Sequence, residues 1–312
     1  MSMIEITNLT KMYGPVTAVD DISLSIGAGQ IMGLLGPNGA GKSTTIKVLC
    51  SYIQATRGTI TVKGHNVETE PLEVKKLIGY LPESAPLYGD MMVFDYLAYV
   101  AEIREVQDVG KRIRELANLC GLRTVMHKNI NELSKGFKQR VGLAHAMMSN
   151  PEILLLDEPT SGLDPNQIIE IREIIKEIGS QKTIILSSHI LSEIEATCNR
   201  VVIINKGKIA ADGTTAQLKR DSGGESIINL EISGADFNTA KAALSQVTAV
   251  KEINQVQCKE SGLTGLAMVT GSAEDVRPEV YRIIKNSDWN LFTMQKESRS
   301  LENVFQLLTK NV

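Results

Sequence analysis

The sequence feature that most constrains the fold of this chain is a glycine-rich run that follows a short apolar segment. Residues 36–44 read GPNGAGKST and match the pattern G-x-x-x-x-G-K-[ST], which is typical of loops that cradle nucleotide phosphates. Residues 30–35 indicate a buried strand before the run, and residues 44–49 indicate a helix with an apolar face after it. An ordinary glycine-rich turn between a strand and a helix is the alternative interpretation, and the motifs further along the chain weigh against it.

The chemistry of phosphate binding explains why these residue types occur together. Glycines let backbone N–H groups crowd round a polyanion because no Cβ lies in the way. The positive end of the following helix points at the phosphates. The amine of Lys42 can reach the β and γ oxygens, and the hydroxyl of Ser43 can ligate Mg²⁺. The predicted nucleotide-binding residues of this loop are Gly36, Pro37, Asn38, Gly39, Ala40, Gly41, Lys42, Ser43 and Thr44.

Length and composition limit the classes of protein to which the chain can belong. Its 312 residues suffice for two domains of ordinary size, and its net charge of −3 argues against a general nucleic-acid binder, which is usually basic. The longest apolar runs, residues 153–156 and 201–204, are far shorter than the roughly 20 residues that a bilayer requires. The first residues carry no signal-peptide pattern, and the scattered cysteines predict reduced thiols in the cytoplasm.

Strand and helix signals alternate through residues 1–220, which we expect to form one domain. This alternation predicts a parallel sheet with helices on both sides. A helical pattern from Asp90, a plausible N-cap, to about Gly121 interrupts it and predicts a helical insert at about residues 86–150. The expected strands of the core are residues 30–35, 77–81, 152–157 and 182–187. A helix is expected at residues 165–178, between the last two of these strands.

A polar, glycine-rich stretch at residues 220–225 predicts a linker to a second domain, residues 221–312. Its expected order is strand, helix, strand, strand, helix, strand, with a last helix from about Leu301. This β-α-β-β-α-β order predicts a small ferredoxin-like α+β domain. The expected elements are residues 226–232, 236–246, 249–258, 263–270, 275–287 and 290–297.

The apolar run at residues 153–156 is followed by two acids, Asp157 and Glu158. Such a strand places its carboxylates at the edge of an open α/β sheet where ligands bind. Asp157 is predicted to hold Mg²⁺, directly or through water, and Glu158 to act as the general base or to position water for attack on the γ-phosphate. Taken alone, an apolar strand that ends in two acids is more often a plain strand end. The predicted roles of Asp157 and Glu158 therefore depend on the phosphate loop with Lys42, which belongs to the same core.

Residues 133–140, LSKGFKQR, resemble the signature sequence of the ABC ATPases. Further matches to this family cover roughly residues 1–220: residues 161–164 fit the loop after the acidic strand, Tyr13 the aromatic that stacks on adenine, and His189 the switch histidine that contacts the γ-phosphate. The resemblance implies the α/β fold of a P-loop NTPase cassette, with a mainly parallel core sheet, an antiparallel β subdomain and a helical insert. It implies ATP and Mg²⁺ as cofactors.

The resemblance also implies a homodimer in which two ATP molecules are sandwiched. Ser134 and Gly136 of one copy would cover the γ-phosphate held by the other. Each residue has an ordinary alternative: Tyr13 could serve packing alone, His189 could be a hydrogen-bonded structural residue, and Ser134 could be only an N-cap.

This sequence departs from the family pattern at two places. In the signature, Lys135 and Phe137 replace the usual glycine and glutamine. The glutamine that touches Mg²⁺ in the family and signals to the membrane domain falls on Glu83. A carboxylate accepts hydrogen bonds but does not donate them at neutral pH, and it is a stronger Mg²⁺ ligand than an amide. Glu83 is therefore expected to keep the metal contact, together with Ser43 and Asp157.

Residues 79–83 and 133–140 together resemble the ATPases of ABC-2-type exporters, in the gliding-motility and polysaccharide or drug-efflux group. This implies an ATP-hydrolysing subunit at the inner face of the cell membrane, which contacts the membrane only through a permease on a separate chain. Action on ribosomes or DNA is an alternative. A GTPase is disfavoured because residues 205–208 lack the Asp of N-K-x-D and read as a hairpin turn. The second domain could be a ligand sensor or could stabilise a dimer.

Overall fold

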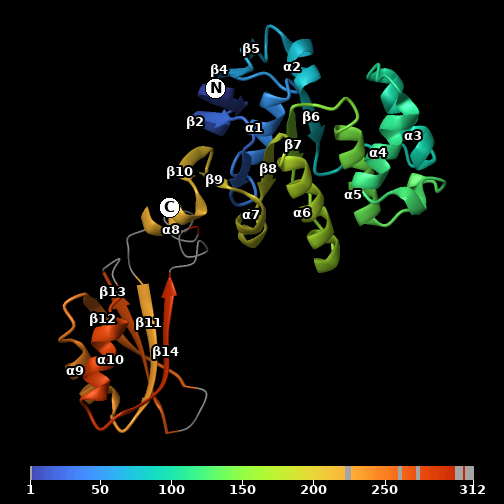
Figure 1. Ribbon diagram of the computed structural model, residues 1–312. Helices are drawn as coiled ribbons and strands as arrows, with labels where there is room; N and C mark the ends of the chain where they lie inside the picture. The colour runs from blue at the N-terminus through green and yellow to red at the C-terminus, as the bar shows by residue number, and fades with distance from the viewer. Residues whose placement is uncertain (1, 222–225, 259–261, 272–274, 299–304, 306–312) are drawn as a thin grey trace. The chain divides into compact units, whose positions relative to one another are not determined.

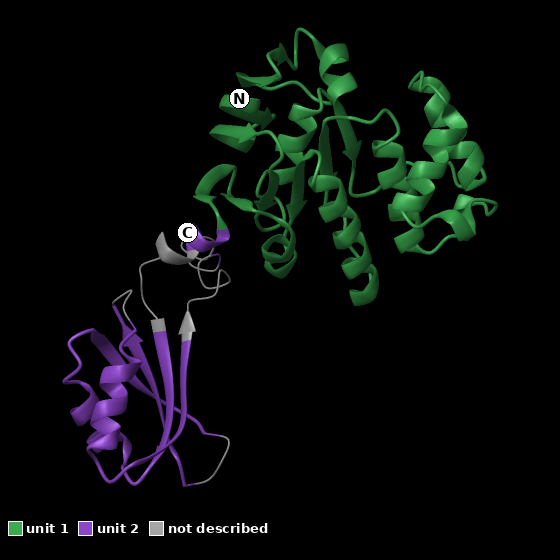
Figure 2. Ribbon diagram, in the orientation of Figure 1, with its two compact units in different colours: residues 1–214 green, residues 215–312 purple. Residues whose placement is uncertain are grey.

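The structure of the chain is a computed structural model that describes residues 2–221, 226–258, 262–271, 275–298 and 305. It contains two compact units, residues 1–214 and residues 215–312 (Figure 2). The sequence placed the division after residue 220. The difference is the short helix α8 (Thr215–Asp221), which belongs to the second unit.

A six-stranded sheet forms the centre of the first unit (Figure 1), in the order β10-β9-β3-β8-β7-β6. Five strands are parallel, and β10 (Lys208–Gly213) adds to the edge as an antiparallel partner of β9. Every residue of β3 and β7 is buried, as in strands covered on both faces. The parallel strands are β3 (Ile31–Leu35), β6 (Ile78–Leu81), β7 (Ile153–Asp157), β8 (Thr183–Ser188) and β9 (Arg200–Asn205).

Residues 205–208 form the hairpin turn that the sequence predicted between β9 and β10. Lys206 and Gly207 have φ angles of 47° and 79°. Two consecutive positive φ angles are what the type I′ turn of a two-residue hairpin requires. The segment is therefore the turn of a hairpin in this structure.

A second, antiparallel sheet has the order β2-β1-β4-β5 and corresponds to the β subdomain expected from the family pattern. Its apolar side chains share one core cluster with residues of the six-stranded sheet and with Ile46, Val48 and Leu49 of helix α1 (Lys42–Leu49). Packing against both sheets fixes the direction of α1 and therefore the place of its N-terminus. The strands are β1 (Ser2–Tyr13), β2 (Val16–Gly27), β4 (Arg57–Val62) and β5 (His65–Asn66).

The helical insert contains α3 (Val93–Ile103) and α4 (Val109–Leu119) in place of one continuous helical pattern. Positive φ angles at Glu105 and Asp108, 52° and 50°, turn the chain between the two helices. Two short 3₁₀ turns, Arg123–Val125 and Ile130–Glu132, lead on to α5.

The expected N-cap at Asp90 is wrong, because α3 begins after Met92 and no side chain caps it. The N–H groups of Val93 and Phe94 instead donate to the carbonyls of Lys128 and Met126, both at 3.0 Å. Backbone acceptors from a neighbouring segment thus satisfy donors that an N-cap side chain would otherwise bind.

Four further helices complete the first unit. Helix α5 falls within the bounds predicted for the insert, residues 86–150, and contacts both α3 and strand β6 of the core sheet. Helix α7 contacts β3 and β8, and α6 contacts α7. The helices are α2 (Pro71–Leu77), α5 (Lys135–Ala146), α6 (Pro165–Gly179) and α7 (Leu191–Thr197). In the described residues we find no helix with the length and hydropathy that a membrane crossing requires.

The second unit has the β-α-β-β-α-β order that the sequence predicted. Its sheet is antiparallel throughout, in the order β12-β13-β11-β14, and side chains from the sheet and both helices form a separate core. Of the expected last helix from Leu301, only residue 305 is described, and it is helical; the rest lies outside the described residues. The elements are β11 (Ser226–Ser233), α9 (Phe237–Leu244), β12 (Val250–Val256), β13 (Thr264–Thr270), α10 (Arg277–Lys285) and β14 (Asn290–Ser298).

Candidate active site

The predicted phosphate loop joins β3 to α1 and lies close against neighbouring backbone. Gly41 precedes α1 with a φ of 108°, and a Cβ at this position would lie 2.5 Å from the carbonyl oxygen of Ala18. A Cβ on Gly36 would collide with the carbonyl oxygen of Ile204. Glycine is thus required at both positions by the close approach of β2 and β9.

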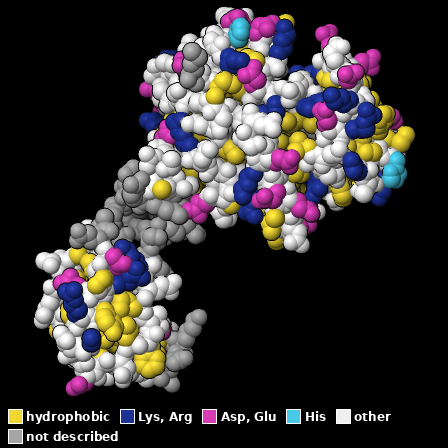
Figure 3. Space-filling view, in the orientation of Figure 1, with side chains coloured by type: hydrophobic (Ala, Val, Ile, Leu, Met, Phe, Trp, Pro, Cys, Tyr) yellow, Lys and Arg dark blue, Asp and Glu magenta, His cyan; other side chains and the backbone are white. Residues whose placement is uncertain are grey.

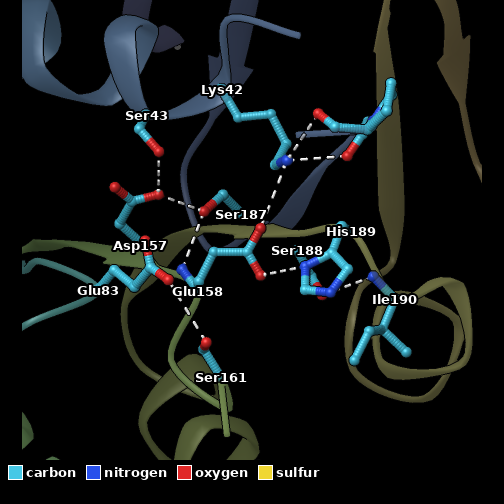
Figure 4. A network of polar contacts seen from close by, with 12 residues as sticks. Lys42, Ser43, Glu83, Asp157, Glu158, Ser161, Ser187, Ser188, His189 and Ile190 are labelled. Atoms are coloured by element: carbon cyan, nitrogen blue, oxygen red, sulfur yellow. Dashed lines mark hydrogen bonds and ion pairs between the residues drawn. The ribbon is translucent and has the colours of Figure 1, made fainter. Parts of the chain in front are cut away.

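Lys42 is buried and holds the loop in shape (Figure 4). Its Nζ donates to the carbonyl oxygens of Gly36 at 2.8 Å and Pro37 at 3.2 Å, and it lies 3.4 Å from Oε1 of Glu158. All three partners are oxygen acceptors. Phosphate oxygens of a nucleotide can take their place without changing the chemistry of the contact.

Asp157, at the end of β7, lies beside the first turn of α1. Its Oδ1 accepts hydrogen bonds from Ser43 Oγ at 2.9 Å and from Ser187 Oγ at 2.6 Å. The structure thus brings together the hydroxyl and the carboxylate that were predicted to bind a metal. Oxygen donors of these two kinds fit Mg²⁺.

Glu158 and His189, the two predicted catalytic residues, contact each other directly. Glu158 Oε2 lies 2.9 Å from Nδ1 of His189, and the Glu158 side chain is only 9% exposed. The φ of Glu158 is 48°, a strained value for a residue with a Cβ, and its N–H donates to Ser187 Oγ at 3.0 Å. The turn after β7 therefore directs the carboxylate toward both Lys42 and His189 (Figure 4).

These groups line one pocket with a volume of about 490 Å³. The volume lies within the range that is common for small-molecule sites. Loop residues, the turn after β7 and the residue after β8 all contribute. The lining residues are Ala18, Asn38, Gly39, Ala40, Gly41, Lys42, Ser43, Thr44, Glu83, Glu158, Ser161 and His189.

Six predicted site residues lie outside the lining of this pocket. Gly36 and Pro37 form the start of the loop, and Asp157 lines the neighbouring groove. The other three lie elsewhere. Tyr13, at the end of β1, is half-exposed, with the amine of Lys11 5.2 Å from its ring centroid. Ser134 is exposed and caps α5, since its Oγ accepts from the N–H of Phe137 at 3.4 Å. Gly136 is buried beside Gln167, and a Cβ there would lie 2.7 Å from the Gln167 side chain.

Glu83 follows β6 and links two pockets. Its Oε1 accepts from Ser161 Oγ at 3.4 Å, and its side chain also lines a groove of about 650 Å³ at the side of the helical insert. Three basic residues, Lys47, Lys75 and Arg104, line this groove as well.

The half-buried side chains of His145 and Tyr80 line the same groove. Nδ1 of His145 lies 2.6 Å from the hydroxyl of Tyr96, and burial, followed by the charge of Arg104, lowers the pKa of His145. Burial and the charge of Asp157 raise the pKa of Tyr80. Both side chains are therefore neutral at pH 7.

Sequence reasoning missed Ser187 and Glu193 on α7. The Ser187 hydroxyl donates to the Asp157 carboxylate and accepts from the backbone N–H of Glu158. Glu193 Oε2 accepts hydrogen bonds from Thr160 Oγ1 at 2.6 Å and Ser188 Oγ at 2.9 Å. A signal was present for the serines, because two polar residues end an otherwise apolar parallel strand next to β7. No motif marked Glu193.

The glycine loop before α1, with the acids at the end of the neighbouring β7, defines a P-loop nucleoside-triphosphatase. Residues 19–161 match the family model described as "ABC transporter", and residues 128–195 also match a model of an AAA domain. The chain is 33% identical to the linearmycin resistance ATP-binding protein LnrL of Bacillus subtilis over 98% of both chains. It is 38% identical to the bacitracin transport ATP-binding protein BcrA of Bacillus licheniformis, over 70% of this chain and 72% of that protein.

Solved structures agree with these sequence matches. The ATP-binding subunit of an ABC transporter has a TM-score of 0.65 and 29% identity, covering 71% of this chain and 94% of that one. A dimeric ATP-binding cassette with ADP and Pi, at 23% identity, shares the fold with a TM-score of 0.63 and covers 68% of this chain and 98% of that one. The chain belongs to the ABC transporter family, as an ATP-binding subunit that hydrolyses ATP. This transport role is supported over action on ribosomes.

Proposed function

We propose that this chain powers an ABC-2-type exporter by closing and reopening as a homodimer around two ATP molecules. The observation that carries the proposal is the meeting of Lys42, Ser43, Glu158 and His189 in one pocket at the end of the parallel strands. Export is supported by the resistance and transport names of the two Bacillus relatives, both over long alignments. In this proposal the permease, and not this subunit, selects the substrate.

In this proposal the amine of Lys42 exchanges its present oxygen partners for phosphate oxygens when ATP binds. Lys42 leaves the carbonyls of Gly36 and Pro37 and the carboxylate of Glu158, and its amine binds the β and γ oxygens. The loop N–H groups and the N-terminus of α1 bind the same phosphates. Loss of the Lys42 contact also frees the Glu158 carboxylate.

Mg²⁺ would be held by the Ser43 hydroxyl and the carboxylates of Asp157 and Glu83. In the described residues no group of three or more His, Cys, Asp or Glu side chains is close enough to hold an ion. We therefore propose that nucleotide oxygens complete the site. The ion supplies positive charge to the phosphate oxygens.

Hydrolysis requires a base beside the γ-phosphate and a group that fixes the phosphate. Glu158 accepts the proton of the attacking water, and His189 binds a γ-oxygen. Their present hydrogen bond of 2.9 Å places both side chains in the same pocket, next to Lys42. In the proposed reaction each side chain turns from the other toward the phosphate.

A second copy would supply the rest of the nucleotide site. Ser134 is exposed at the N-terminus of α5, a position that suits binding of an anion. We propose that Ser134 and Gly136 cover the γ-phosphate held by the other copy and that Tyr13 stacks on adenine. Approach of the second copy would have to displace the Gln167 side chain from Gly136.

The groove beside the helical insert is our proposed docking site for the permease. Glu83 lines both this groove and the phosphate pocket, so a change at the γ-phosphate can reach the permease through one residue. The chain would then lie in the cytoplasm on the inner face of the membrane and contact it only through the permease. Nucleic acid is not a proposed partner: the net charge is −3, and basic and acidic side chains are interspersed on the face in Figure 3.

The test uses a membrane protein encoded beside this chain, co-expressed and reconstituted with it in lipid vesicles. We expect the two to purify together and the permease to raise the ATPase rate several-fold. Reversing charge in the groove by Arg104→Glu should lower co-purification and keep basal ATP hydrolysis. Co-sedimentation of the chain with ribosomes in place of membranes would contradict the proposal.

Glu83→Gln is expected to leave the rate of ATP hydrolysis within about tenfold of the native rate, about 1.4 kcal/mol in activation free energy. The amide keeps one oxygen for Mg²⁺ and for the Ser161 hydroxyl, which now lies 3.4 Å away. Steady-state hydrolysis at several Mg²⁺ concentrations measures the effect, with a higher Mg²⁺ requirement expected. A loss of several orders of magnitude would show that the carboxylate has another role.

A further inference from the structure

Two parallel links join the loop that carries Glu158 to the loop that carries His189. We name residues 158–164 the acid loop and residues 187–190 the histidine loop. The outer link is the contact of 2.9 Å between Glu158 Oε2 and His189 Nδ1. The inner link is Glu193 Oε2, which accepts from Thr160 Oγ1 in the acid loop and from Ser188 Oγ in the histidine loop.

The inner link fixes backbone as well as side chains. The N–H of Ile190 donates to Ser188 Oγ at 3.0 Å (Figure 4), and that hydroxyl donates onward to Glu193 at 2.9 Å. On the other side, the Thr160 carbonyl accepts from the N–H of Leu163 at 3.2 Å. Glu193 therefore holds the chain next to His189 against the turn that follows Glu158.

The two links differ in exposure. Glu193 is 8% exposed and Ser188 is fully buried, while the side chain of His189 is 44% exposed. A hydrogen bond shielded from water is stronger than an open one. The inner link is thus the more durable of the two, and the outer link faces the pocket.

One oxygen of Glu193 is left over. Its Oε1 is buried and has no hydrogen-bond partner. An unpartnered buried oxygen costs about 1–3 kcal/mol, so a residue retained for stability alone would not leave one. An orphaned buried group at a functional site calls for a functional explanation.

We propose that Glu193 is a positioning residue for ATP hydrolysis, which keeps the acid and histidine loops at a fixed spacing when the outer link opens. The inference rests on the proposed roles of Glu158 and His189, because both must turn from each other to the γ-phosphate and the attacking water. Once they do so, the outer link no longer holds the loops. The buried inner link then sets the distance between base and histidine.

Glu193→Ala is expected to lower kcat about tenfold or more and to change KM for ATP less than about twofold, since the loops move only after ATP is bound. Glu193→Gln keeps an oxygen that accepts both hydroxyls and should keep kcat within about threefold. Glu195→Ala, on the exposed side of the same helix, is the matched control and should retain the native kcat.

An unchanged kcat in Glu193→Ala would overturn the proposal. So would equal losses in the Ala and Gln variants accompanied by a rise in KM, because that result indicates a general loss of structure. If Glu193→Ala does not fold, Thr160→Val and Ser188→Ala each remove one arm of the link, and their effects on kcat should be non-additive. Additive effects would count against it.

The role of Glu158 is tested separately. Glu158→Gln turning over ATP at the native rate would refute the proposed function and leave the kcat of the Glu193 variants to be explained in another way. Loss of turnover in Glu158→Gln, together with a native kcat in Glu193→Ala, would refute only the inference about Glu193.

Discussion

Glu158→Gln is expected to lower kcat for ATP hydrolysis by about a hundredfold or more, with ATP affinity retained. Glutamine has nearly the same shape and can keep the contact with His189 and the N–H bond to Ser187. It cannot take a proton from water. It also removes the negative charge beside Lys42, which lies 3.4 Å away and is then freer to bind phosphate.

Single-turnover hydrolysis and ATP binding by titration calorimetry measure the two quantities separately. In the presence of ATP and Mg²⁺ the variant should accumulate as a dimer in size-exclusion chromatography. Glu152→Gln is the matched control: this acid precedes the same strand and makes an exposed ion pair with Lys63, worth about 1 kcal/mol or less. Native turnover in Glu158→Gln would show that Glu158 is not the base.

Local sequence predicted the parts of the site that local chemistry determines. The loop at residues 36–44 needs glycine where backbone from β2 and β9 approaches, and the structure shows this crowding at Gly36 and Gly41. Apolar runs with strand length became β3 and β7 because both faces of the sheet are covered. Since parallel strands end at one edge, Ser43 and Asp157 were expected to meet, and they lie 2.9 Å apart.

Local sequence did not predict what long-range contacts determine. Two serines at the end of an apolar run were a weak signal for Ser187, but its contact with the end of β7 depends on how the strands are placed. No motif marked Glu193. The predicted start of α3 was wrong because the first N–H groups of this helix donate to the backbone carbonyls of Lys128 and Met126, which lie far along the chain. The proposed roles of Ser134 and Gly136 depend on contacts with the nucleotide of a second copy, and local sequence does not determine such contacts.

Lys42→Ala is expected to lower ATP affinity by about a hundredfold, about 2.7 kcal/mol. A hydrogen bond to a charged group contributes about 1.5–3 kcal/mol, and the lysine amine would make at least one with the phosphates. Its loss also leaves the 9% exposed Glu158 side chain without its cation, and that charge then repels the nucleotide. Fluorescent-nucleotide titration with and without Mg²⁺ measures the affinity.

Two comparisons separate phosphate binding from loop stability. Lys76→Ala removes a surface lysine that pairs with Glu73 and should keep native ATP affinity. Lys42→Ala should also lower Tm, because the carbonyls of Gly36 and Pro37 lose their donor. In the double variant with Glu158→Gln, part of that Tm loss should return, because no unpaired charge remains, while ATP affinity should stay low. ATP affinity within threefold of native in Lys42→Ala would contradict the assignment of Lys42 to the phosphates.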